Sequence, residues 1–321
     1  LKKMSKRDWS AAHFTAVCGN INIFDNLRRK GLEINSMTCN ELNILDIACI
    51  NKQTEFCKKL IKEAEGLDLN LDKSDDRGWT IVHIAVRVGN SEIFEQLING
   101  HHIEIAKTKT SYSKKTILHI CCEYGHYALG RMIVGNDNFQ ALLHDIDKKD
   151  WNALHFCAKG GNLNLFKLIE TYFTPSTLWT VTEDGKTVLH ICCIHKNVEI
   201  CEYLCKKFKS DTRKINKKTN KGWTAAHYVA VEIQQNDTEE KLINILNKVD
   251  KDLLKAQTND GYTVLTVACE HRNEALVRYL VKKFPELLDI GWDKLTQVAS
   301  DAGDEIRDII DNARIKRTRR C

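Results

Sequence analysis

Proline is nearly missing from this chain of 321 residues, in which only Pro175 and Pro285 are present. Long apolar runs are missing as well, so we expect no helix that crosses a bilayer. The start Leu1-Lys2-Lys3-Met4 resembles no secretory leader, and because it does not begin with methionine we expect a segment of a longer protein. With 43% hydrophobic and 28% charged residues, the composition indicates a folded chain and excludes a disordered one.

Most of the chain also has no large excess of positive or negative charge. The formal net charge is +5, and Arg314, Lys316, Arg317, Arg319 and Arg320 account for all of it, so residues 1–313 are neutral overall. A neutral body argues against nucleic acid as a partner. The basic end is typical of a solvated terminus, and a nuclear import or phosphate-binding patch is the alternative.

The chain has an internal repeat in place of these features. The first copy reads Ser10-Ala11-Ala12-His13; further copies with the histidine begin at Thr80, Thr116, Asn152, Thr187 and Thr224, and two without it begin at Asn43 and Thr263. Successive copies are 33, 37, 36, 36, 35, 37 and 39 residues apart, and a weaker ninth copy surrounds Lys294. A repeat of this length indicates a solenoid of stacked units.

Each copy predicts two helices. The opening Ser, Thr or Asn can accept hydrogen bonds from the free amides of a helix start. Small and apolar residues follow at helical spacing, up to a break such as Gly125-His126. A second apolar stripe follows each break, for example Leu163, Leu165, Phe166 and Ile169. In the seventh copy, residues 232–238 replace the break with a longer polar stretch, which predicts an enlarged loop.

In these features the chain resembles the ankyrin repeat family, whose unit of about 33 residues has a turn, a Thr-Pro-Leu-His helix start and two antiparallel helices. The resemblance covers residues 8–312, as eight repeats and a degenerate capping repeat. It implies an all-α ankyrin-repeat solenoid of stacked helix-turn-helix units with β-turn fingers. The family's proline is replaced by Ala, Ile or Val in every copy. We therefore expect an N-terminal linker (1–7), the repeat array (8–312) and a basic tail (313–321).

The cysteines and the repeated histidines are predicted to be structural. Seven cysteines occupy slots that the ankyrin family fills with alanine, which predicts buried, reduced thiols; they are Cys49, Cys121, Cys122, Cys157, Cys192, Cys193 and Cys269. Neighbours such as Cys192 and Cys193 are expected to point apart, and Cys201 with Cys205 and His195 lacks a fourth zinc ligand. The resemblance implies that the histidine of each copy bridges backbone groups of neighbouring turns.

Tryptophan precedes the capping residue of every second copy. This pre-cap residue is Trp9, Leu42, Trp79, Lys115, Trp151, Lys186, Trp223 and Tyr262 in successive copies. In the ankyrin family the position lies on the projecting finger, at the edge of the concave face, and it varies with the partner. Because tryptophan is enriched in binding hot spots, the candidate partner-binding residues are Trp9, Trp79, Trp151, Trp223 and Tyr262. The alternative is that each indole lies across lysine stems of the next finger and braces the array.

The predicted function is that of a non-catalytic scaffold, which binds one or more protein partners through the concave and finger face of a preformed solenoid. No local motif for a nucleophile, a phosphate loop or a metalloprotease is present, so we expect no enzyme, catalytic residue, cofactor, metal or small-molecule substrate. The expected location is cytoplasmic. Two alternatives stay open: the cytosolic ankyrin segment of a larger channel, receptor or enzyme, and a nuclear regulatory factor that uses the basic tail.

Overall fold

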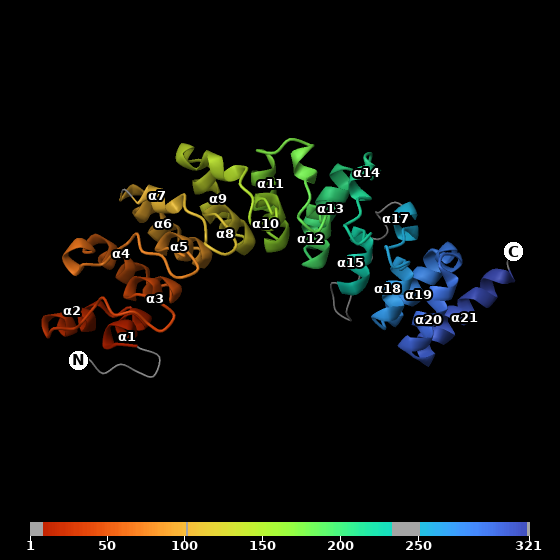
Figure 1. Ribbon diagram of the computed structural model, residues 1–321, viewed down its shortest axis with the longest axis horizontal. Helices are drawn as coiled ribbons and strands as arrows, with labels where there is room; N and C mark the ends of the chain where they lie inside the picture. Colours follow the sequence, from red (N-terminus) through yellow and green to blue (C-terminus); the bar gives the residue numbers. More distant parts are fainter. Residues whose placement is uncertain (1–8, 101, 233–250, 320–321) are drawn as a thin grey trace. The chain divides into compact units, whose positions relative to one another are not determined.

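The fold consists of helices joined by turns and projecting fingers (Figure 1). The computed structural model describes residues 9–100, 102–232 and 251–319. The expected linker (1–7) and nearly all of the expected enlarged loop lie outside these residues. Within them there is no strand, only one isolated bridge between Ser74 and Thr80. The prediction of an all-α solenoid is confirmed. The chain divides into two compact parts, residues 1–172 and residues 173–321.

The N-terminal part is a row of helix pairs. The first helices of the pairs are α1 (Ala11–Cys18), α3 (Ile44–Ile50), α5 (Ile81–Val88), α8 (Ile117–Tyr124) and α10 (Ala153–Gly160). The second helices are α2 (Ile21–Arg29), α4 (Thr54–Lys62), α6 (Ser91–Asn99), α9 (Tyr127–Val134) and α11 (Leu163–Glu170). Helix α7 (Ile103–Ala106) and 3-10 turns at Glu65–Leu67 and Asp137–Leu143 lie in the connections. Each first helix packs on the next one in sequence, so the order of repeats is the order of packing.

The C-terminal part continues this scheme. Its first helices are α12 (Val188–Ile194), α15 (Ala225–Glu232), α18 (Val264–Glu270) and α20 (Trp292–Ala302), which again pack in sequence order. Among the described residues of this part, the other helices are α13 (Val198–Lys207), α14 (Thr212–Ile215), α17 (Lys251–Lys255), α19 (Glu274–Lys283) and α21 (Asp304–Thr318). The 3-10 turns are Thr177–Trp179 and Pro285–Asp289.

The basic end of the chain continues helix α21. The boundary that we expect between the array and the tail, at residue 313, falls inside this helix. The guanidinium carbon of Arg314 lies 3.5 Å from the centre of the Trp292 ring, and Arg317 forms an ion pair with Asp289. Cations near the end of a helix also interact favourably with its dipole. Up to Thr318, the basic end is therefore packed on the last repeat.

The opening polar residue of each repeat caps a helix, as the sequence predicts. In α8 the backbone N–H of His119 donates to Thr116 Oγ1 at 3.2 Å, and in α10 that of His155 donates to Asn152 Oδ1 at 3.0 Å. Helix α8 ends at Gly125, whose φ of 72° is a left-handed conformation that glycine adopts without strain. These two residues determine where a first helix begins and ends.

In four repeats the histidine joins the helix start to the next finger. The backbone N–H of Thr116 donates to His119 Nδ1 at 3.3 Å, so the ring proton lies on Nε2, which donates to the carbonyl oxygen of Asp145 at 3.1 Å. The corresponding Nε2 contacts of three more histidines are His13 to Ser36, His83 to Thr108 and His227 to Tyr262. All four imidazoles are fully buried. The structural role implied for them is confirmed.

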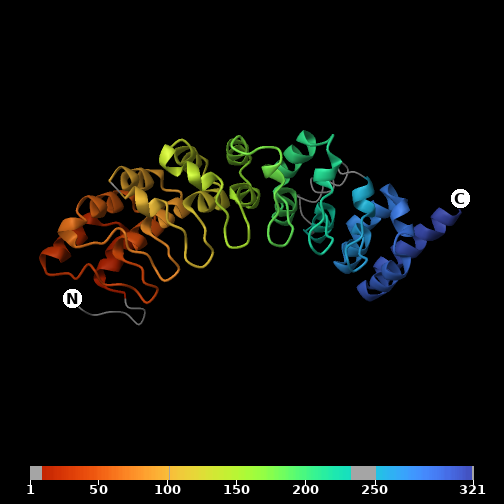
Figure 2. The same cartoon turned by 45° about the horizontal axis from the view of Figure 1, so that its top comes forward.

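The fingers form a second set of contacts between neighbouring repeats. Figure 2 shows them projecting from the helix layers. In the N-terminal part, Ser111 N–H donates to Arg77 O at 2.7 Å and Lys148 N–H to Ser113 O at 3.0 Å. In the C-terminal part, Asn220 N–H donates to the Asp184 carbonyl at 3.1 Å. The fingers of adjacent repeats are therefore held in register by their backbones.

The first prediction concerns the thiols. All seven alanine-slot cysteines are buried, whereas Cys18 and Cys39 are exposed. Burial also raises the pKa of Cys121 well above its usual value, which removes the reactive thiolate. We expect isotope-labelled N-ethylmaleimide to modify Cys18 and Cys39 in the native protein, and Cys121, Cys157 and Cys192 only after unfolding. Peptide mapping by mass spectrometry measures both, and equal labelling of all five would contradict the burial.

The second prediction concerns acid stability. Burial lowers the pKa of His83 and His119 to about 4, against 6.5 for an exposed histidine. Between these values the unfolded chain binds protons that the folded chain does not, so the free energy of unfolding should fall as the pH drops from about 6.5 towards 4. The protection factors of the amides in α5 and α8, which are exchange rates corrected for the intrinsic effect of pH, should fall over this range.

Helix α3 is the internal control for this titration. Asp46 occupies its histidine slot, and burial raises the pKa of this carboxyl group to about 6. A raised carboxyl pKa has the opposite sign: the folded chain binds the extra proton between about 6 and 3.8, which favours folding on acidification. Faster loss of protection in α3 than in α5 and α8 would overturn the assignment.

Candidate protein-binding surface

A local turn holds each pre-cap residue in place. The backbone N–H of Trp79 donates to Asp75 Oδ1 at 2.7 Å, and that of Trp151 donates to Asp147 Oδ1 at 2.9 Å. In the C-terminal part, threonine hydroxyl groups are the acceptors: Thr219 Oγ1 accepts from the backbone N–H of Trp223, and Thr258 Oγ1 accepts from that of Tyr262, each at 3.1 Å. Asp and Thr side chains commonly close turns in this way. The short-range sequence therefore sets the direction in which these rings leave the backbone.

Each tryptophan packs on the start of its own first helix. The ring centres of Trp79 and His83 are 6.0 Å apart, and those of Trp151 and His155 are 6.1 Å apart. Trp9 and Trp223 make the same contact with their histidines at 5.9 and 5.7 Å. These separations are typical of favourable aromatic pairs. All five candidate residues are half-buried, so each ring is supported on one side and partly accessible to solvent.

Of the five candidate residues, Tyr262 best fits the alternative in which the aromatic ring braces the array. The ammonium group of Lys294, from helix α20 of the following repeat, lies 4.7 Å from the centre of the Tyr262 ring. At that distance the cation is attracted to the face of the ring. The contact is the one that the alternative predicts, an aromatic ring covered by a lysine of the next repeat. For Trp79 and Trp151 the partners are different.

Two kinds of partner for the tryptophans were not predicted. A second aromatic ring follows five residues after three of them, and its centre lies 5.5 Å (Phe14), 5.3 Å (Phe156) and 5.1 Å (Tyr228) from the indole. The spacing of the two aromatics is visible in the sequence and could have revealed this pair. The third repeat has no such aromatic, and there the Arg87 guanidinium lies 5.6 Å from the Trp79 ring centre.

Arg87 also connects two repeats. Its guanidinium carbon lies 5.7 Å from the ring centre of Tyr124, at the end of α8, and 45% of Tyr124 is exposed. The Tyr124 ring is stacked on His126 with an angle of 8° between the planes. A planar guanidinium between two aromatic rings is a favourable arrangement. An ordered row of Trp79, Arg87 and Tyr124 therefore runs from one repeat to the next.

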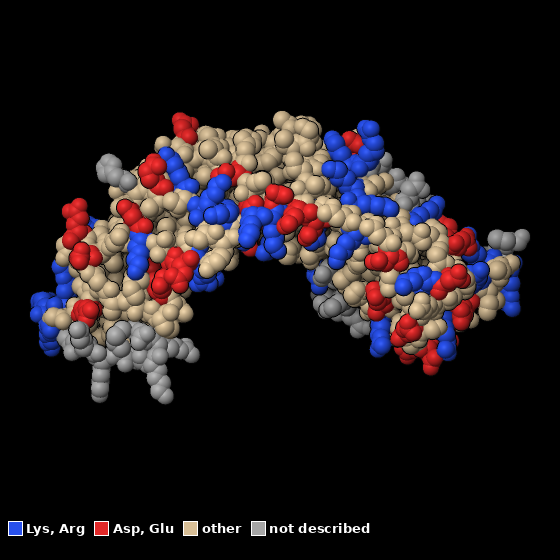
Figure 3. Space-filling view, viewed as in Figure 1, with Lys and Arg blue, Asp and Glu red and all other residues tan. Residues whose placement is uncertain are grey.

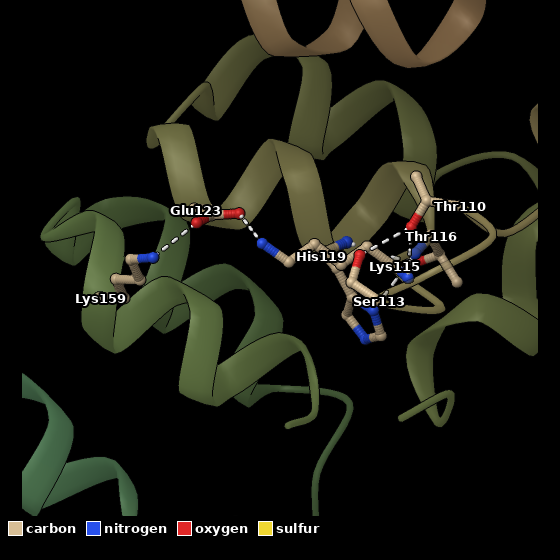
Figure 4. A network of polar contacts seen from close by, with 7 residues as sticks. All are labelled: Thr110, Ser113, Lys115, Thr116, His119, Glu123 and Lys159. Carbon is tan, nitrogen blue, oxygen red and sulfur yellow. Dashed lines mark hydrogen bonds and ion pairs between the residues drawn. The ribbon is translucent and has the colours of Figure 1, made fainter. Parts of the chain in front are cut away.

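A charged network continues the row towards Trp151. Glu123 of α8 accepts from Lys115 Nζ at 2.5 Å and from Lys159 Nζ of α10 at 2.6 Å (Figure 4). The Lys115 ammonium group lies 4.9 Å from the ring centre of Phe156, which in turn packs on Trp151. We refer to Trp79, Arg87, Tyr124, Lys115, Trp151 and Lys159 together as the Trp79–Trp151 surface. It lies entirely within the N-terminal part.

Opposing effects act on the carboxylate at the centre of this network. Partial burial by itself would raise the pKa of Glu123, but the hydrogen bonds from Lys115 and Lys159 outweigh it and lower the pKa below its usual value. The carboxylate therefore stays ionised at neutral pH. Figure 4 also shows Lys115 held from the other side, where its backbone N–H donates to Thr110 Oγ1 at 3.0 Å.

The structure brings together three cysteines, two of which, Cys192 and Cys193, we expected to point apart: the three sulfur atoms all lie within 4.8 Å of one another. Cys201 Sγ lies 3.0 Å from Cys192 Sγ and 3.6 Å from Cys193 Sγ, because α13 packs directly across the end of α12. His195, in contrast, is exposed. Burial raises the pKa of Cys192 and of Cys201, whereas hydrogen bonds from these two thiols lower the pKa of Cys193 to about 5. The three sulfur atoms are thus joined by hydrogen bonds inside the fold. We assign the cluster to core packing.

Comparison with known proteins identifies the family. The family model for ankyrin repeats (3 copies) matches residues 65–139, 82–178, 132–218 and 168–252, which together span more than half of the chain. The chain belongs to the ankyrin repeat family. Ankyrin repeats generally act as protein-interaction modules and typically have no catalytic role. In the part of the chain that the structure describes, no helix is long and apolar enough to cross a membrane.

Several curated proteins share ankyrin sequence with this chain. It is 24% identical over 300 residues to the putative ankyrin repeat protein L371 of Acanthamoeba polyphaga mimivirus, covering 83% of this chain and 36% of that protein. It is 33% identical over 100 residues to alpha-latrotoxin-Lh1a of Latrodectus hasselti, covering 31% of this chain and 7% of the toxin. The probable 26S proteasome regulatory subunit p28 of Saccharomyces cerevisiae is 29% identical over 115 residues, which are 36% of this chain and 48% of the subunit. The chain thus spans less than half the length of these relatives.

One solved structure is similar in part. It is the Bd0816 predatory endopeptidase from Bdellovibrio bacteriovorus in complex with immunity protein Bd3460. The matched chain is 18% identical in sequence, with a TM-score of 0.49, and the match covers 64% of this ankyrin chain and 100% of the matched chain.

The third prediction concerns the charged network. Replacing Glu123 by Gln leaves Lys115 and Lys159 without their shared counter-ion in a largely buried place, so we expect a loss of about 1–3 kcal/mol in the free energy of unfolding. Urea denaturation followed by circular dichroism measures this loss. The matched control is Glu92→Gln, which removes an exposed partner of Lys58 and should cost less than about 0.5 kcal/mol. Equal effects of the two substitutions would contradict the role of the network.

Proposed function

We propose that this chain binds a protein partner, without catalysis, through the Trp79–Trp151 surface. The observation that carries the proposal is the fixed, half-buried position of two tryptophans on the third and fifth repeats. Arg87, Tyr124, Lys115 and Lys159 are ordered between them. Trp9 in the same part and Trp223 and Tyr262 in the C-terminal part occupy the same slot of their repeats. We propose them as further contacts.

Preorganisation is the physical reason for proposing this surface. Binding costs free energy when flexible side chains become ordered, and here the turns and ring contacts have ordered them already. Tryptophan, tyrosine and arginine are also the residues most enriched in binding hot spots. The rings follow neighbouring repeats, so an extended partner such as a protein segment would contact more of them than a small molecule would.

A second candidate is that the chain works as the ankyrin segment of a larger channel, receptor or enzyme. The length of the curated relatives supports it, since the chain spans only part of each. In that case the same surface would bind either a separate protein or another domain of the larger protein. A cytoplasmic location remains our proposal for either case. The nuclear alternative relies on cations of which two, Arg314 and Arg317, contact Trp292 and Asp289.

The fourth prediction tests the surface. The partner is first captured from extract of the source organism on the immobilised chain, identified by mass spectrometry and purified. Replacing Trp79 or Trp151 by Ala should then weaken its binding about thirtyfold, because a hot-spot tryptophan contributes about 2 kcal/mol or more. Isothermal titration calorimetry gives the dissociation constants, and circular dichroism shows whether the helices are retained.

Lys186→Ala is the matched control for this experiment, because Lys186 fills the pre-cap slot of the sixth repeat. Its substitution should change the affinity less than about twofold. If the tryptophan variants keep their helices and bind as tightly as the unmodified chain, the indoles brace the array instead.

A further inference from the structure

One short stretch of the C-terminal part is strongly basic. Residues 206–221 contain seven lysines and one arginine against a single aspartate, a net charge of +7. The whole chain has a net charge of only +5, so the other residues together are slightly acidic. The corresponding stretch two repeats later, residues 282–297, has three lysines and three acidic residues. The excess is therefore a property of one repeat and not of the fold.

These cations follow one another along a short part of the fold. They lie on the last turn of α13, in the turn after it, on the short helix α14 and in the finger that follows. Figure 3 shows lysine and arginine side chains clustered where Figure 1 places α13 and α14, whereas the two signs alternate over the helices from α18 to α21. We call this the 206–221 basic surface; its residues are Lys206, Lys207, Lys209, Arg213, Lys214, Lys217, Lys218 and Lys221.

The ion pairs and hydrogen bonds recorded for these side chains, among the residues that the structure describes, involve one carboxylate. Asp211 is the one carboxylate within the stretch, and it faces both Arg213 (3.7 Å) and Lys214 (3.2 Å). Lys217 and Lys218 donate to the carbonyl oxygens of Trp179 and Gln257, which carry no net charge. Lys206, Lys209 and Lys221 are exposed, and 93% of the Arg213 side chain is accessible. Positive charges that follow one another so closely along the chain repel one another.

We propose that the 206–221 basic surface binds an acidic segment of a protein, one rich in aspartate and glutamate. Charge complementarity carries the inference, because carboxylates would relieve the repulsion among the cations and speed association. The site is separate from the Trp79–Trp151 surface, which lies in the N-terminal part, and it goes beyond the proposed function.

The same residues argue against nucleic acid. Single-stranded nucleic acids are held by exposed aromatic rings on which bases stack. The aromatic ring of this stretch, Phe208, is covered by the ammonium groups of Lys207 and Lys214, at 5.8 and 5.5 Å from its centre. The stretch therefore offers no uncovered ring on which a base could stack. Lysine binds carboxylates and phosphates alike, so the DNA arm of the experiment below distinguishes the two kinds of partner.

The experiment uses the full chain and a fluorescein-labelled peptide of about twelve alternating aspartate and glutamate residues. We expect binding by fluorescence anisotropy, with an affinity that falls steeply between about 50 and 300 mM NaCl. Combining Lys206→Gln, Lys209→Gln, Arg213→Gln and Lys221→Gln should weaken binding about tenfold, the effect of four exposed ion pairs. These side chains are exposed, so the helices should be retained.

Three comparisons decide the outcome. Lys282→Gln with Lys283→Gln, at the matching end of α19, should change the peptide affinity less than about twofold. The Trp79→Ala and Trp151→Ala variants should bind the peptide as the unmodified chain does, which separates this inference from the proposed function. An unchanged affinity of the quadruple variant would overturn the inference, as would tighter binding, through the same four residues, of single- or double-stranded DNA of about twenty nucleotides or base pairs.

Discussion

A neutral, buried imidazole is the contact on which this structure most depends. Its Nδ1 accepts from the backbone at a helix start, and its Nε2 donates to a carbonyl oxygen of the next finger, as at His119. One side chain thereby satisfies backbone groups of two repeats that water cannot reach. Protonation would turn the accepting nitrogen into a donor, and this is why burial and the hydrogen-bond pattern both favour the neutral ring.

This contact has consequences for the fingers. A histidine ties the helix start of its repeat to the finger that follows, as His83 does through the carbonyl oxygen of Thr108. The tryptophan that precedes the same helix packs on this histidine, as Trp79 does on His83. The candidate binding residues are therefore connected to the element that stabilises the array. A surface built in this way is rigid before any partner arrives, which limits the entropy lost on binding.

Charge is organised locally on this chain although its sum is close to zero. In the N-terminal part, Glu123 joins two lysines from neighbouring repeats and orders the residues near Trp151. In the C-terminal part, residues 206–221 include eight cations and a single carboxylate, Asp211. The first arrangement positions side chains, while the second leaves a field that extends into solvent. The net charge of the chain reveals neither arrangement, because it sums over repeats whose charges differ.

The sequence by itself determined the solenoid, the helix starts at residues such as Thr116, the structural role of the histidines and the burial of cysteines such as Cys121. These features depend on neighbours in sequence or on a slot that recurs, and repetition multiplies a weak local signal. Only the tertiary structure decided which side chains of different repeats meet. It placed Arg87 between Trp79 and Tyr124, joined Glu123 to Lys159, and brought Cys201 to Cys192 and Cys193. The reason is that contacts between helices depend on the packing angle and on the length of each side chain, and the periodicity of the sequence specifies neither of them.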